Sequence, residues 1–120
     1  MRILEFTRGD IYSIENFETL DSDIQLKLEF LIDYLKSKNI QIQLILTPYH
    51  PAVYNRVITA SKYKIVGASE DYFNTLAKSK QIPLIGSFNS TKLALVDTDF
   101  YDGMHCNGES MLRILHPIMN

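Results

Sequence analysis

Hydrophobic positions recur at helical spacing soon after position 20. Apolar side chains follow at intervals of three or four over positions 24–35, behind cap-forming residues at 21–23. Lys36 suits the negative end of the helix dipole. The pattern predicts a helix that begins at Asp21 or Ser22 and runs past position 35.

Two apolar runs of strand length follow this helix. The first, over residues 40–46, changes from alternation to continuous apolar residues and ends at Thr47-Pro48. The second covers residues 82–86. A continuous apolar run is typical of a parallel strand covered on both faces. These runs therefore predict two buried parallel strands.

Three more helices are predicted around these strands. Pro51 suits the first turn of a helix that carries Val53, Val57 and Ile58. Ser69 is predicted to cap a helix over 70–80. Asn107 is predicted to cap a last helix, which Pro117 would end. The aromatic residues predicted on or beside apolar helix faces, and hence in the core, are Phe17, Phe30, Tyr34, Tyr72 and Phe73.

The order of elements predicts the fold class. Parallel neighbours need crossover helices, so helices that alternate with buried strands indicate an α/β fold. The length of 120 residues suits a single domain over residues 1–120. Residues 1–19 are predicted to be a hairpin or a linker, because β-prone runs at 2–6 and 11–14 flank a glycine at position 9.

Charge and composition narrow the function classes. Twelve Lys and Arg against fourteen Asp and Glu give a net charge of -2, with no basic cluster, so no nucleic-acid partner is predicted. The longest apolar runs are about four residues, against ~20 for a membrane span, and the N-terminus lacks a signal-peptide core. We therefore expect a cytoplasmic protein as written. The one cysteine, Cys106, makes no internal disulfide.

The ligand crevice of a parallel sheet lies beyond the carboxyl ends of its strands. The first predicted strand is followed there by Tyr49 and His50, and the second by Ser87 and Asn89. A third polar segment, residues 97–105, precedes the last helix. We expect these three loops to meet along one edge of the sheet.

Asp102 and His105 are the strongest candidates for chemistry. An Asp three residues before a His in a turn can accept the Nδ1 proton while Nε2 faces the cleft, as a general base requires. The alternative is a helix-entry loop in which both side chains bond only to backbone. Ser87, at the end of a strand, is the best candidate nucleophile in the chain, unless it only caps or turns that strand.

Three blocks resemble the C-terminal half of SGNH/GDSL-type hydrolases: Thr47–Pro51, Ile85–Phe88 and Asp99–Asn107. The resemblance covers residues 20–116. It implies a flavodoxin-like three-layer α/β/α domain in which Asp102 and His105 are the acid and base of a Ser-His-Asp triad. The implied substrate is a small-molecule or carbohydrate O-acyl ester, and acyl transfer on cell-surface polysaccharide would place the parent protein at the envelope. The predicted substrate-binding residues in the crevice loops are Tyr49, His50, Asn89 and Tyr101.

The chain departs from this family at the nucleophile. SGNH enzymes take it from a Gly-Asp-Ser block, whereas Gly9-Asp10 is followed here by Ile11. The chain thus resembles an incomplete domain, and loss of even one oxyanion donor costs on the order of 10²-fold in rate. We therefore expect this chain to lack full activity. The runner-up is a non-catalytic binding or assembly module, a homodimer formed through an unpaired sheet edge.

Two further residues, His50 and Cys106, can each be interpreted in two ways. His50 either lines the pocket or caps the helix that follows it. Cys106 is either an activated thiol at a helix N-terminus or a small buried apolar residue. The calcium-loop template fails, because it would need Gly at Asp102 and Glu at Gly108. No metal or other cofactor is predicted.

Overall fold

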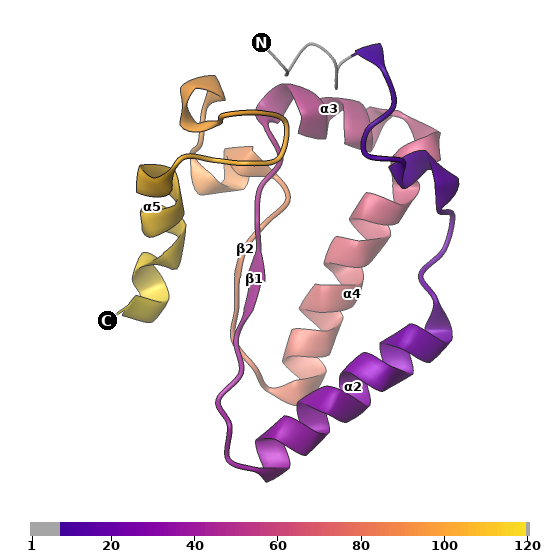
Figure 1. Cartoon of the computed structure of the whole chain (residues 1–120), viewed down its shortest axis with the longest axis vertical. Coiled ribbons are helices and arrows are strands. Elements are labelled where there is room, and N and C mark those ends of the chain that lie inside the picture. The colour runs from indigo at the N-terminus through magenta and orange to yellow at the C-terminus, as the bar shows by residue number, and fades with distance from the viewer. Residues whose placement is uncertain (1–7, 120) are drawn as a thin grey trace.

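The computed structural model describes residues 8–119. Strands β1 (Leu44–Leu46) and β2 (Leu84–Gly86) pair in parallel. The α helices of the described chain are α2 (Ser22–Ser37), α3 (Pro51–Thr59), α4 (Lys64–Lys80) and α5 (Gly108–Met119). Short 3-10 turns are η1 (Ile14–Asn16), η2 (Ser61–Tyr63), η3 (Ser90–Leu93) and η4 (Asp97–Asp99). Helices α2 and α4 lie on one face of the strand pair and α5 on the other, while α3 crosses the carboxyl ends (Figure 1).

The sheet is narrow. Its strands overlap in the view down the shortest axis, along which the molecule measures 18 Å (Figure 1). Leu44 pairs with Leu84, and the same offset continues beyond the strands in a parallel bridge between Tyr49 and Asn89. The prediction of a mixed α/β chain with parallel strands is confirmed.

Gly86 allows the two strands to approach closely. Its φ is 83°, in the left-handed region that side chains disfavour. A Cβ atom at this position would lie 2.2 Å from the carbonyl oxygen of Leu46. The end of β2 therefore requires glycine on both conformational and steric grounds.

The predicted helix starts are confirmed where a local side chain makes the cap. Asp21 accepts a hydrogen bond from the N–H of Ile24 over 3.0 Å at the start of α2. Pro51 is the first residue of α3. Asn107 accepts from the N–H of Ser110 over 2.9 Å at the start of α5.

The predicted strand at 11–14 is wrong. Tyr12 and Ser13 have φ values of 50° and 60°, which an extended strand does not allow, and η1 begins at Ile14. Ile11 is fully buried beneath α3 and η2 as part of a core cluster. The partner strand predicted at 2–6 lies outside the described residues.

Both buried strands are shorter than predicted, with three residues each. Leu46 is buried, whereas Ile45 is 40% exposed, so the prediction of full cover on both faces is wrong for β1. A strand with a neighbour on one side only loses ladder hydrogen bonds along its other edge, and this shortens its regular part.

Two predicted helix boundaries are also wrong. Helix α4 begins at Lys64, directly after η2, and the hydroxyl of Ser69 donates to the carbonyl of Ile65 inside it. Helix α5 continues past Pro117 to its end at Met119. Helix α4 starts before the predicted cap, Ser69, because Tyr63 and Val66 are buried beneath α3 and this packing holds the segment in place.

Three clusters of buried residues form the core. One lies under α3 and η2, one between α2, α4 and the strands, and one between α5 and the loop before it. Tyr72 and Phe73 pack against the second cluster, as predicted. Phe17, Phe30 and Tyr34 are 60%, 73% and 51% exposed, so their prediction as core residues is wrong.

Candidate functional site

Backbone hydrogen bonds join the three loops beyond the carboxyl ends of the strands. The N–H of Tyr49 donates to the carbonyl of Phe88 over 3.0 Å. The N–H of the next residue, His50, donates to the carbonyl of Gly103 over 2.9 Å. The predicted meeting of the loops is therefore confirmed, and the segment with Asp102 and His105 lies beside the start of α3.

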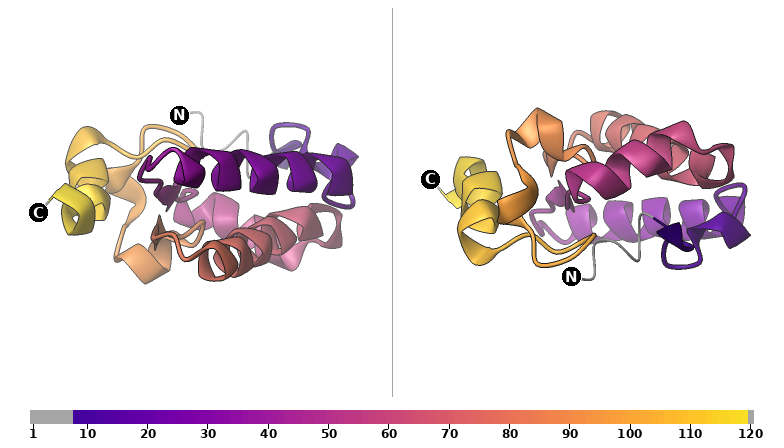
Figure 2. Two further views of the ribbon diagram at one scale, coloured as in Figure 1. Left: turned by 90° about the horizontal axis from the view of Figure 1, so that it is seen from below. Right: turned by 90° about the horizontal axis from the view of Figure 1, so that it is seen from above.

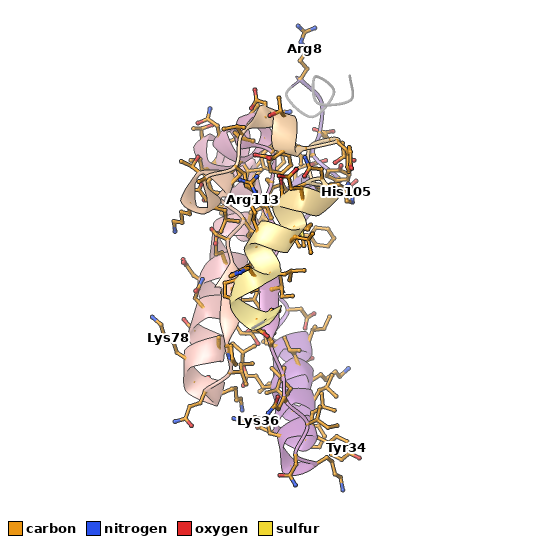
Figure 3. The ribbon with its side chains drawn as sticks, turned by 90° about the vertical axis from the view of Figure 1, so that its left-hand side faces the viewer. Arg8, Tyr34, Lys36, Lys78, His105 and Arg113 are labelled. Atoms are coloured by element: carbon orange, nitrogen blue, oxygen red, sulfur yellow. The ribbon has the colours of Figure 1, made fainter. Side chains whose placement is uncertain are left out.

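Asp102 and His105 lie in direct contact. Nδ1 of His105 is 2.8 Å from Oδ2 of Asp102, and the side chain of His105 is 70% exposed. Figure 3 shows the imidazole at the surface, on the loop that leads into α5. With its Nδ1 proton directed to the carboxylate, Nε2 is the ring atom that can accept a proton from a ligand, and no hydrogen bond within residues 8–119 engages it.

Asp102 is held as an anion by its own loop. Its Oδ1 accepts the backbone N–H groups of Met104 and His105 over 2.8 and 2.9 Å. Burial alone would raise the pKa of Asp102. The hydrogen bonds from the N–H of Met104 and from the ring and N–H of His105 have the larger combined effect, so the pKa lies below its usual value. The carboxylate is thus fixed in place and ready to orient the imidazole.

Asp99 anchors this loop to α5. Its Oδ2 accepts the N–H of Val96 over 2.8 Å, and its Oδ1 accepts Ser110 Oγ and Arg113 Nη2, each over 2.7 Å. The N–H of Val96 first, and then the hydroxyl of Ser110, lower the pKa of Asp99. The sequence pattern did not indicate this anchoring role of Asp99, because its partners on α5 lie more than ten positions away along the chain.

A short antiparallel bridge closes the same loop. Phe100 pairs with Cys106, and the N–H of Tyr101 donates to the carbonyl of His105 over 2.8 Å. The side chain of Tyr101 is 72% exposed. The two ends of the loop are therefore held together, and Tyr101 and His105 are the next pair of residues inside this bridge.

His50 is buried, and its helix-capping role is the one observed. Its Nδ1 accepts the N–H of Ala52 over 3.1 Å, which places the proton on Nε2. Nε2 faces Oδ1 of Asp97 at 3.5 Å, and the ring packs edge-on against Phe100. Burial lowers the pKa of His50 although Asp97 opposes the shift. His50 therefore connects α3 to the loop rather than offering an open ligand atom.

Ser87 and Asn89 are engaged in local structure. The Ser87 hydroxyl donates to Oε1 of Glu70 over 2.5 Å and accepts the N–H of Asn89. Oε1 of Glu70 also accepts the N–H of Phe88 over 3.2 Å. The Asn89 side chain caps η3 by accepting from Thr91. Among the described hydrogen bonds, none brings Ser87 to His105.

A small apolar pocket lies beside these loops. It has a volume of about 260 Å³, and its lining includes Tyr49, Phe88 and Phe73. Tyr49 and Phe88 meet edge to face with ring centroids 5.7 Å apart. Burial, and then Tyr12, raise the pKa of Tyr49, so its hydroxyl stays neutral. Of the predicted substrate-binding residues, Tyr49 is the one that lines this pocket.

The remaining candidates do not form a second site. Burial raises the pKa of the half-buried Cys106 thiol, which opposes the activated-thiol interpretation. No three His, Cys, Asp or Glu side chains gather as metal ligands in residues 8–119. In the same part of the chain, no helix has the length and apolar character of a membrane span.

Comparison of the chain with protein-family models, curated proteins and solved structures finds no match.

Proposed function

We propose that this chain carries the acid–base pair of an acyl-ester hydrolase or acyltransferase. His105 is the general base, and Asp102 orients it. The observation that supports this proposal is the 2.8 Å contact from Nδ1 of an exposed imidazole to a carboxylate that its own loop holds ionised. The resemblance of residues 99–107 to SGNH/GDSL-type hydrolases favours the same reaction class.

In the proposed ester hydrolysis, water is the nucleophile. Nε2 of His105 accepts a proton from water as the water oxygen bonds to the acyl carbon. The resulting tetrahedral intermediate then breaks its bond to the alcohol oxygen, which takes the proton back from Nε2. The products are a carboxylic acid and an alcohol, and Asp102 stabilises the transient imidazolium. In acyl transfer an acceptor hydroxyl replaces the water.

The proposed substrate is an O-acyl ester, with carbohydrate esters as the class that the resemblance implies. The apolar pocket beside Tyr49 and Phe88 suits a short acyl chain. The exposed ring of Tyr101 suits stacking on a sugar next to His105. This mechanism does not use Ser87, because its hydroxyl proton is directed to Glu70.

Hydrolysis of p-nitrophenyl acetate tests the proposal. Without the Gly-Asp-Ser block, we expect slow turnover that His105→Ala lowers about tenfold or more, since general-base catalysis contributes roughly 10²- to 10⁴-fold in complete sites. Asp102→Asn should lower it as well. The matched control is His116→Ala, which removes an exposed imidazole from α5. Equal rates for the wild type and His105→Ala would refute the proposal.

We keep a non-catalytic assembly module as a second candidate. The observation that favours it is the two-stranded sheet, in which β1 and β2 pair only with each other within the described residues. An isolated pair of short strands is marginally stable, and an unpaired edge accepts a further strand. Ile45→Lys places a charge on the exposed residue of β1 and should block such pairing. The measurement is the hydrogen exchange of the β1 amides as protein concentration rises.

A further inference from the structure

Helix α2 presents an unusually apolar outer face to solvent. Phe30, Leu31 and Tyr34 are 73%, 49% and 51% exposed, and the flanking Ile24 and Leu26 are 63% and 64% exposed. The opposite face of α2 holds buried Ile32 and packs on α4. Figures 1 and 2 show α2 at the periphery with α4 beside it, and Figure 3 shows Tyr34 directed away from the molecule. A soluble helix normally carries polar residues there.

The charges on this face are ordered along it. Asp23 stands in the first turn, Lys27 one turn later and Lys38 at the C-cap, and all three are exposed. Together with Phe30, Leu31 and Tyr34 they follow at intervals of three and four residues, which places them on one stripe. The stripe is acidic where the helix begins, aromatic in the middle and basic where the helix ends.

We propose that this stripe is the interface of a symmetric dimer, in which α2 packs antiparallel against α2 of a second copy. A two-fold axis between Phe30 and Leu31 makes the stripe complementary to itself. Asp23 then faces Lys38 of the second copy, and Lys27 faces the ring of Tyr34 of the second copy. Each contact occurs twice, as a two-fold interface requires.

Electrostatics favours this orientation over the parallel one. Antiparallel packing puts the positive end of each helix dipole beside the negative end of the other. It also pairs opposite charges at both rims and places an ammonium over an aromatic ring. Lys38 already lies 5.6 Å from the Tyr34 ring centroid within one copy, so both residues are in position at the same rim.

The exposed area is sufficient for a dimer. Five large apolar side chains, each half to three-quarters exposed, present on the order of 600 Å², given about 150 to 250 Å² for a whole aromatic side chain. This matches the largest apolar patches of monomers, at roughly 300 to 600 Å², and approaches the ~800 Å² per partner of a standard interface. The flanking charged residues supply the polar rim.

Sedimentation equilibrium of the full chain tests the proposal. We expect a species of twice 13.8 kDa at micromolar concentration. Phe30→Asp should weaken the dimer by roughly 30-fold or more, since it buries charge at the two-fold axis. The exposed position of Phe30 lets this variant fold, which circular dichroism verifies. A monomeric wild type across this range would overturn the proposal.

A charge exchange tests the register. Asp23→Lys and Lys38→Asp should each weaken the dimer several-fold, and the double variant should restore it because both pairs are rebuilt with reversed sign. Failure of the double variant to recover would exclude the antiparallel register. Ile45→Lys is the control for the sheet edge: loss of the dimer in Ile45→Lys but not in Phe30→Asp would assign the interface to β1 instead. Because His105 lies outside the stripe, the ester assay and the dimer assay fail independently.

Discussion

The backbone N–H of His50 donates to the carbonyl oxygen of Gly103 over 2.9 Å, and this bond joins the start of α3 to the loop of the proposed base. Gly103 immediately follows Asp102. Its partner, His50, also caps α3 through Nδ1. The position of the Asp102–His105 pair therefore depends on the backbone of a residue whose buried imidazole takes no part in the proposed chemistry.

His50→Ala should destabilise the fold by roughly 2 to 4 kcal/mol, because it removes a helix cap and a buried ring. His50→Asn should recover about 0.5 to 2 kcal/mol of this loss, the usual contribution of an N-cap, since Asn is a strong N-cap but does not replace the ring. Chemical denaturation at neutral pH measures both. Equal loss in the two variants would contradict the capping role.

The same residue predicts a pH dependence. Burial lowers the pKa of His50 in the folded state, so the unfolded chain binds more protons as pH falls below the ordinary histidine value of ~6.5. The stabilisation by neutral His50 is therefore present above this pH and is lost below it. Unfolding free energies from neutral pH down to acid pH should show a shallower slope for His50→Asn than for the wild type.

Protonation of the Asp99 and Asp102 carboxylates should cause a second loss of folding stability, at more acidic pH. Asp102 and Asp99 have pKa values below the usual range, so their contribution to the free energy of unfolding is present above pH ~3.9, the ordinary pKa, and is lost as pH falls through and below it.

At neutral pH Asp102→Asn should cost about 1 kcal/mol of stability, because neutral acceptors bind N–H donors less strongly. The deficit should shrink toward acid pH. Asp71→Asn, an exposed carboxylate on α4, is the control for nonspecific charge effects.

Two glycines should respond to alanine in opposite directions. Gly86→Ala should destabilise the fold by roughly 2 to 5 kcal/mol, because it combines left-handed strain with a clash against the Leu46 carbonyl. Gly67→Ala, in the interior of α4 with open space around the new methyl group, should stabilise it by about 0.5 to 1 kcal/mol. Thermal unfolding compares the pair, and an unchanged or higher melting temperature for Gly86→Ala would contradict the strand geometry.

The contact between Glu70 and Ser87 should appear as a coupling energy. A cycle of Glu70→Ala, Ser87→Ala and the double variant should give roughly 1 to 3 kcal/mol, because each single variant leaves the other group without its partner. Ser79→Ala, on the same helix as Glu70, should be additive with Glu70→Ala. An additive result for Ser87 as well would mean that its hydroxyl is free in solution.

The sequence alone determined the features that depend on neighbouring residues. Asp21 and Asn107 cap helices three residues away, Pro51 starts α3, and the contact between Asp102 and His105 spans one turn of chain. Such contacts can be predicted from the sequence because only a few backbone torsions fix the distance between their atoms.

Tertiary structure decided which individual side chains meet when they are distant along the chain. The proton of Ser87 goes to Glu70 on another element, and burial turns His50 from a candidate ligand into a cap. Phe30 and Tyr34 have a helical pattern that suits a core, yet α2 packs on α4 through its other face. Periodicity shows which side chains share a face, but only the packing of whole elements determines which face meets protein and which meets water.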